Sequence, residues 1–220
     1  MKVLICVPCM DAVQTSFFTS VLGLRYDPRH QYHWSVKCNS LVYNARNEMA
    51  MEAIGGGYDV MVSFDSDLVL PEDALTRLVD GIEAGADFVT GLYFRRRLPT
   101  SPLILKALDW YEDGVLGAQE VAEVYEDYPR DAVFPVAGAG FGCCAVRVEA
   151  MRKVVPMFRV APFTPMPRLS EDYSFCWRLG KVEGVKMVCD SGLKPGHAGL
   201  WVYGEKDWDG QVKMKHGAEE

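Results

Sequence analysis

The amino-acid sequence contains no apolar run of the roughly 18 to 20 residues that a membrane-spanning helix needs. The apolar stretch within residues 2–8 is shorter than the ~7 to 15 residues of a signal-peptide core, and Pro8 ends it. This stretch is more typical of a buried first strand. We therefore expect a cytoplasmic protein with no transmembrane segment.

Positive charge is also scarce. Lys and Arg number 23 against 30 Asp and Glu, which gives a net charge of −7. Non-specific binding to nucleic acids needs a basic surface that displaces counterions from phosphates, so the composition disfavours it. A local basic pocket remains possible, and Arg95, Arg96 and Arg97 are its candidates. The simpler interpretation of this triplet is a solvated surface turn.

The 7 cysteines include no second pair at the spacing of a zinc finger. Cys6 and Cys9 form a C-x-x-C, but the first lies in the expected strand. Cys143 and Cys144 are adjacent and would point to opposite faces of a strand. We interpret the cysteines as buried free thiols in a reducing compartment.

Linkers, repeats and long charge runs are absent as well. At ~150 residues per domain, one domain over residues 1–220 is the simplest division. The 49% hydrophobic content supports a sizeable core.

The first half of the chain alternates apolar runs with helical spacing. This order predicts an α/β protein with a mostly parallel central sheet and helices on both faces. Strands are expected at 2–8, 33–36, 58–64 and 88–92, and helices at 13–24, 39–54 and 71–84.

The second half is less regular. We expect a hairpin or short mixed segments in 100–135, a glycine-rich strand pair in 136–146, a helix from 148, a loop in 156–170, a helix in 172–180, a strand in 186–189 and a frayed polar end.

The clearest chemical motif is Asp65-Ser66-Asp67, directly after an expected strand. Ligands of open α/β sheets bind at the carboxyl ends of strands. Carboxylates at i and i+2 of an extended segment point the same way, and their hard oxygens suit Mg²⁺ or Mn²⁺ with substrate phosphates. A simple turn is the alternative, and we favour the metal site.

Glu171 and Asp172 follow the proline-rich loop and begin a helix. Asp172 could act as a general base, and the loop could cover a substrate. The alternative is helix capping by Ser170 with acids in the first turn.

Two further side chains are candidates. His197, flanked by glycines, could be a third metal ligand, and an ordinary turn histidine is the alternative. Arg46 could reach a phosphate or could pair with a carboxylate on the helix surface. The glycines at 138, 140 and 142 do not match a dinucleotide-binding fingerprint.

Taken in order, these motifs resemble those of glycosyltransferase family 2 and its relatives with the GT-A fold. Members have a first strand ending in Pro, an Ala-Arg-Asn helix before an acidic strand end, a glycine-rich strand leading to an Arg, a Glu-Asp helix start and a late His near a glycine. The matching segments here are 3–8, 45–47, 65–67, 138–147, 171–172 and 197–199.

The resemblance implies roles for single residues. Asp65 and Asp67 would bind the metal ion, Asp65 also near the ribose, and His197 would complete the site. Asp172, beside Glu171, would be the catalytic base of an inverting transfer. The residues expected around the nucleotide are Pro8, Cys9, Arg46, Asp65 and Ser66.

The resemblance also implies a GT-A fold with a nucleotide-sugar half at about 1–92, an acceptor half at about 93–200 and a polar tail at 205–220. The cofactor would be Mn²⁺ or Mg²⁺, and the donor a UDP- or GDP-linked sugar. The acceptor would be a glycan, a lipid-linked or another hydroxyl, with DNA disfavoured by the net charge. Compact versions are typical of phage and bacterial genomes, so a phage enzyme would work in the host cytoplasm.

Two alternatives remain. A nucleotidyltransferase of sugar phosphates usually carries a glycine-rich basic loop after the first strand, whereas residues 9–14 here contain neither glycine nor a basic residue. A non-catalytic sugar-nucleotide-binding domain predicts broken acidic sites, whereas the acids are present.

Overall fold

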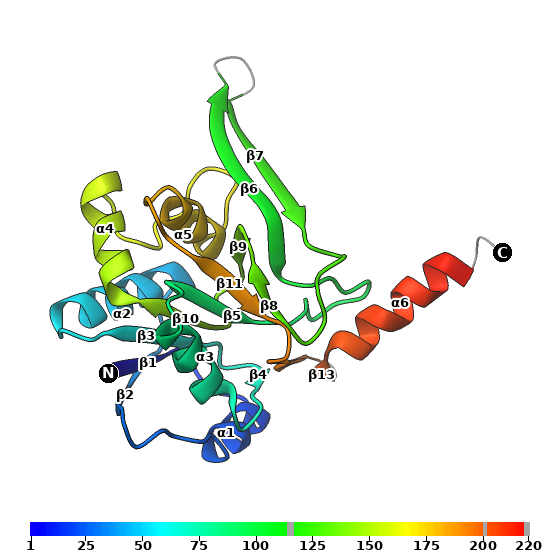
Figure 1. The fold of residues 1–220 in the computed structure, drawn as a ribbon, viewed down its shortest axis with the longest axis horizontal. Helices are drawn as coiled ribbons and strands as arrows, with labels where there is room; N and C mark the ends of the chain where they lie inside the picture. Colours follow the sequence, from blue (N-terminus) through cyan, green and yellow to red (C-terminus); the bar gives the residue numbers. More distant parts are fainter. Residues whose placement is uncertain (114–116, 200–201, 218–220) are drawn as a thin grey trace.

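The main sheet has seven strands and mixed direction (Figure 1). The computed structural model describes residues 1–217 except 114–116 and 200–201, with only the backbone for 212–217. Across the sheet the strands are β2 (Gln31–Lys37), β1 (Lys2–Pro8), β3 (Val60–Phe64), β10 (Cys143–Arg147), β5 (Phe88–Gly91), β11 (Met187–Asp190) and β8 (Val133–Pro135). Only β10 and β8 run against the others. The predicted α/β class is confirmed, and the sheet is mixed because β10 and β8 pair antiparallel with their neighbours.

Helices cover both faces of this sheet, because successive residues of its strands point to opposite sides. In β1, Leu4 and Cys6 join one hydrophobic cluster, whereas Val3, Ile5 and Val7 join the other. The first cluster is covered by α2 (Val42–Gly55), α4 (Val148–Phe158) and α5 (Glu171–Gly180), and the second by α1 (Thr15–Leu22) and α3 (Ala74–Glu83). Both faces of the inner strands are therefore dry, which explains their continuous apolar runs.

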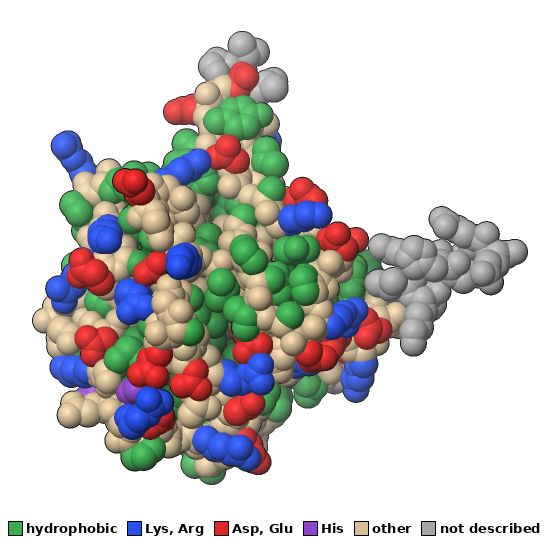
Figure 2. Space-filling model, in the orientation of Figure 1, with side chains coloured by type: hydrophobic (Ala, Val, Ile, Leu, Met, Phe, Trp, Pro, Cys, Tyr) green, Lys and Arg blue, Asp and Glu red, His purple; other side chains and the backbone are tan. Residues whose placement is uncertain are grey.

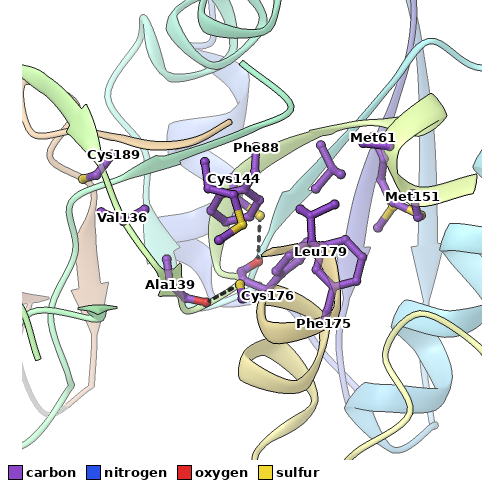
Figure 3. Close-up of a cluster of buried hydrophobic side chains, with 14 of the residues drawn as sticks. Met61, Phe88, Val136, Ala139, Cys144, Met151, Phe175, Cys176, Leu179 and Cys189 are labelled. Carbon is purple, nitrogen blue, oxygen red and sulfur yellow. Dashed lines mark hydrogen bonds between the residues drawn. The ribbon is translucent and has the colours of Figure 1, made fainter. Parts of the chain in front are cut away.

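The cysteines mostly pack into these clusters as free thiols. Figure 3 shows Cys144, Cys176 and Cys189 among the side chains of the first cluster. Cys143 lies in the second cluster, so the two adjacent cysteines do point to opposite faces. Cys38 is exposed and departs from the expectation of burial.

Two small sheets extend the main one. β12 (Gly196–Ala198) pairs with β4 (Leu68–Val69) and β13 (Val202–Tyr203). β6 (Ile104–Asp113) and β7 (Gly117–Val124) form a hairpin that projects from the body (Figure 1), and β9 (Gly138–Ala139) pairs with the base of β6. The β4–β12 pairing brings two motifs that are far apart in sequence to the same edge of the sheet.

Three expectations from the second half need correction. The glycine-rich segment is not a strand pair, because β9 pairs with β6 while β10 enters the main sheet. The loop begins later than expected, since α4 continues to Phe158 with Pro156 inside it. The polar end is helical as far as the structure describes it, because α6 spans Glu205–Gly217 and its Trp208 is buried in the first cluster. Residues 218–220 of the expected frayed end lie outside the described residues.

The surface shows no single charge sign on the face in view. Figure 2 shows acidic and basic side chains interspersed over it. Among the described residues, no helix combines the length and apolar character needed to span a bilayer.

Candidate functional site

A cavity of about 210 Å³ opens where β1 and β3 end. Its wall contains Pro8, the last residue of β1, and Asp65, the first residue after β3. The two strands are parallel neighbours, so their carboxyl ends meet at one edge of the sheet. The lining residues are Pro8, Cys9, Met10, Ser40, Val42, Asp65, Ser66, Asp67 and Arg96. Five residues selected from the sequence thus share one cavity.

The glycine-rich segment packs closely against Asp65, because Gly142 has no side chain. The Asp65 amide donates to the Gly142 carbonyl at 2.8 Å, and the Gly142 amide donates to the Tyr93 hydroxyl at 2.8 Å. A Cβ at Gly142 would lie 2.9 Å from Asp65 Oδ2, and one at Gly140 would lie 2.3 Å from the Tyr93 hydroxyl. Burial and the Asp65 charge raise the pKa of Tyr93 well above its usual range. The small residues therefore serve close packing of Tyr93 against the acidic strand end.

Arg46 is buried and joins two acids from distant segments. Its Nη2 lies 2.8 Å from Asp65 Oδ1, and its Nη1 lies 2.6 Å from Glu171 Oε1. Burial opposes the charge, but the carboxylates of Asp65, Asp172 and Glu171 outweigh it and raise the pKa of Arg46. The sequence left open a phosphate contact or a carboxylate pair on the helix surface for Arg46; here Arg46 is buried and its guanidinium pairs with two carboxylates.

Glu171 and Asp172 differ in their surroundings. Glu171 faces Arg46, and its pKa is raised mainly by burial despite that arginine. Asp172 Oδ1 accepts hydrogen bonds from the Ser170 hydroxyl and from the Tyr173 amide at 2.8 Å. Within the described residues Asp172 Oδ2 has no recorded hydrogen bond. Ser170 occupies the N-cap position of α5, yet its side chain makes no cap hydrogen bond. The arrangement that the capping interpretation expected, with Ser170 at the N-cap and both acids in the first turn, is present without the cap hydrogen bond.

Asp67 and His197 meet through the β4–β12 pairing. The Ala198 amide donates to the Asp67 carbonyl at 2.8 Å, and His197 Nε2 lies 3.4 Å from Asp67 Oδ1. His197 Nδ1 bonds the Phe94 carbonyl at 2.8 Å, so this nitrogen carries the proton and Nε2 is directed to Asp67. Burial raises the pKa of Asp67, but His197 and Arg96 outweigh it, and the net pKa is lowered.

The expected three-residue metal site is only partly assembled. Asp67 and His197 converge, whereas Asp65 turns to Arg46. Arg96 forms an ion pair with Asp67 Oδ2. In the described part of the chain, no group of three or more His, Cys, Asp or Glu side chains could hold a metal ion. A cation here would have two protein ligands, an anchored imidazole and a carboxylate, and would need phosphate and water for the rest of its shell.

The loop between α4 and α5 is fixed by the protein itself. Phe163 is fully buried and stacks on Phe175, with ring centroids 4.6 Å apart. Two backbone amides of the loop donate to the side chains of Asn47 and Ser174. Two of its carbonyls accept hydrogen bonds from the side chains of Trp110 and Arg178. The sequence favoured a loop that could cover a substrate, and contacts within the chain hold this loop in place.

Sequence reasoning named Arg96 as a candidate for a local basic pocket, with a surface turn as the simpler interpretation, and here Arg96 contacts Asp67. It missed one contact of a cavity residue. Cys38 was not linked to Cys9, although their Sγ atoms lie 3.0 Å apart. The signal for this pair was available, because Cys9 and Cys38 directly follow the paired strand ends Pro8 and Lys37.

Comparisons with known proteins show the fold alone. No family model matches the chain, and no curated protein matches it. Among solved structures, the chain is similar to A197 from STIV, with a TM-score of 0.60 and 18% identity over 90% of this chain and 86% of that one. The chain therefore shares the overall architecture of A197 across nearly its whole length.

Replacing Arg46 with Met should lower the free energy of unfolding by about 3 to 5 kcal/mol, because two largely buried carboxylates lose their counter-charge. Urea unfolding followed by circular dichroism measures the loss. The control is Arg25→Met, whose ion pair with Glu72 is mostly exposed and should contribute about 1 kcal/mol or less. Equal losses in the two variants would contradict the assigned importance of Arg46.

Acid should weaken the contacts of Asp67. Because its folded-state pKa is lowered, its stabilisation is present above the unfolded value of about 3.9 and is lost as pH falls through the folded value. The difference in unfolding free energy between wild type and Asp67→Asn should therefore shrink as the pH falls from about 6 to about 2. The control is Asp127→Asn, whose side chain is 76% exposed. A difference independent of pH would exclude this contribution.

Proposed function

We propose that the protein is a metal-dependent glycosyltransferase that moves a sugar from a nucleoside-diphosphate donor to an acceptor hydroxyl, with inversion at the anomeric carbon. The carrying observation is the cavity at the ends of β1 and β3, whose wall combines Pro8, Cys9 and the three residues 65–67. Arg46 links the same edge to the start of α5, and β12 brings His197 to it. A shared architecture with A197 supports the fold on which this proposal depends.

The donor would bind across this cavity. Of the residues that line the cavity, Pro8 and Cys9 would contact the nucleotide base, and Asp65 and Ser66 would lie beside the ribose and phosphate. Asp67 and His197 would hold a divalent cation, Mn²⁺ or Mg²⁺, which supplies positive charge to the leaving diphosphate when bound. His197 suits this task because its Nδ1 is anchored on the Phe94 carbonyl.

Asp172 is the general base in this proposal. Its Oδ1 is held by the Ser170 hydroxyl and the Tyr173 amide, which fixes the carboxylate and leaves Oδ2 for the acceptor. As the acceptor oxygen attacks the anomeric carbon, Oδ2 takes the hydroxyl proton. The bond from that carbon to the phosphate oxygen breaks, and the nucleoside diphosphate leaves with the electron pair.

Arg46 and Glu171 position these groups. Their ion pair connects α2 to the first residue of α5, next to Asp172, while the second nitrogen of Arg46 holds Asp65. Glu171 therefore orients the helix start that carries the base, and its own oxygen is occupied. We assign it a positioning role.

Binding of a nucleoside diphosphate with Mn²⁺ should stabilise the protein. At ~100 times its dissociation constant, a ligand adds about 2.7 kcal/mol, which a thermal melt resolves. The melts use UDP, GDP, CMP and dTDP, each with Mn²⁺ and with EDTA. We expect one diphosphate to shift the melting temperature, and the shift to need Mn²⁺ and to disappear in Asp67→Ala.

Other outcomes favour other functions. Stabilisation by a nucleoside triphosphate with release of pyrophosphate would favour a nucleotidyltransferase of sugar phosphates. Binding of a nucleotide-sugar without hydrolysis or transfer would favour a non-catalytic sugar-nucleotide-binding domain. No shift with any nucleotide would reject the proposal.

Asp172→Asn should keep donor binding and lose ~10²- to 10⁴-fold in the rate of transfer, the usual scale for general-base catalysis. Donor hydrolysis or transfer to a test acceptor measures the rate, and the melting shift measures binding. Asp127→Asn, on the exposed surface, serves as the matched control. A normal rate in Asp172→Asn would assign the base to another group.

A further inference from the structure

Arg95, Arg96 and Arg97 lie on a loop that its own hydrogen bonds hold in place. The proposed reaction assigns no role to these arginines. Phe94 and Pro102, at the two ends of this loop, form a β-bridge. The Arg95 amide donates to the Ser101 carbonyl at 3.0 Å, and the Thr100 hydroxyl donates to the Arg95 carbonyl at 2.6 Å. These contacts fix the backbone that presents the arginines.

A second cavity, of about 380 Å³, is formed by this loop. Its lining residues are Arg95, Arg96, Arg97, Leu103 and His197, and we name it the arginine cavity. Arg96 also lines the Asp65–Asp67 cavity, so the two cavities adjoin. His197 likewise lines the second cavity and contacts Asp67 of the first.

The charges in the arginine cavity are poorly balanced. Arg96 pairs with Asp67, and the positive charge of Arg95 opposes the larger rise that burial causes in the pKa of Tyr173. Arg97 is exposed and makes no ion pair with any residue that the structure describes. Asp67 is thus the one carboxylate in the described structure that is ion-paired with the triplet. In a chain with a net charge of −7, this is a local concentration of positive charge.

The geometry points to a binding site for a phosphoryl group in the arginine cavity, carried either by the donor diphosphate or by a phosphorylated acceptor. Guanidinium groups bind phosphate oxygens in paired fashion, and three of them suit a tetrahedral dianion. Ligand cavities usually measure about 300 to 1,000 Å³. The first cavity, at about 210 Å³, falls below that range, so a nucleotide-sugar has to extend beyond it.

Arg96 lies between the two sites and can serve either. Its guanidinium contacts Asp67 in this structure and also borders the arginine cavity. A phosphoryl group in the arginine cavity competes with Asp67 for this arginine. The inference rests on the proposed function only for the identity of the molecule that carries the phosphate.

The test is a calorimetric titration of inorganic pyrophosphate into the metal-free protein in EDTA. Wild type should bind, with affinity that falls as salt is added. Arg97→Gln should weaken binding about 10-fold or more, the scale of one charge-assisted hydrogen bond. Arg25→Gln, an exposed arginine elsewhere, should bind as wild type does. No binding by wild type, or equal binding by Arg97→Gln, would overturn the site.

A second arm identifies the carrier of the phosphate. The nucleoside diphosphate that shifts the melting temperature is titrated into wild type and Arg97→Gln. If Arg97→Gln binds the nucleoside diphosphate more weakly than wild type does, the phosphoryl group in the arginine cavity belongs to the donor. If the variant binds the nucleoside diphosphate normally but pyrophosphate more weakly, the phosphoryl group belongs to the acceptor. If no nucleoside diphosphate binds, the proposed function fails, while the pyrophosphate titration still decides whether the cavity binds phosphate.

Discussion

The candidate site depends on one buried guanidinium. Arg46 lies on α2, yet its two terminal nitrogens reach Asp65 after β3 and Glu171 at the start of α5. A buried charge is costly without a partner, so these three segments are stable only when they are close together. The ion pairs thus fix the distance between the Asp-Ser-Asp motif and the helix that carries Asp172. The chain joins these groups across more than 100 positions of sequence, because Arg46 and Glu171 are separated by 125.

Close packing supplies the second constraint. The Tyr93 hydroxyl and the Asp65 carboxylate both fill space that a Cβ at Gly142 would occupy. The buried Tyr93 hydroxyl accepts a hydrogen bond from the Gly142 amide, so neither polar group is left without a partner. Tyr93 also contacts the His197 ring edge-on, with centroids 5.8 Å apart. One buried tyrosine therefore connects the glycine-rich segment to both acidic positions of the motif.

Sequence predicted those features that depend on local pattern. Strands buried on both faces give continuous apolar runs, and their parallel order brings Pro8 and Asp65 to one edge. The patterns of the second half were misleading where a single distant contact decides the structure. The buried Trp208 packs α6 against the core, and the bridge of Phe94 to Pro102 shapes the arginine loop. Neither contact leaves a periodic signal in the sequence.

The electrostatics of the site explain why arginines pair with the two carboxylates that the sequence predicted as metal ligands. Two carboxylates at the end of β3 repel each other and would repel a diphosphate, so this edge of the sheet needs positive charge whether a metal is bound or absent. Arg46 supplies it to Asp65 from below the surface, and Arg96 supplies it to Asp67 from the rim. Breaking the buried Arg46–Asp65 contact would leave a buried charge unpaired, which is costly. The Arg96–Asp67 contact is half-exposed, so breaking it costs little. Asp67 is therefore the acid whose partner can change on binding, and Asp65 is the one whose partner is fixed by the fold.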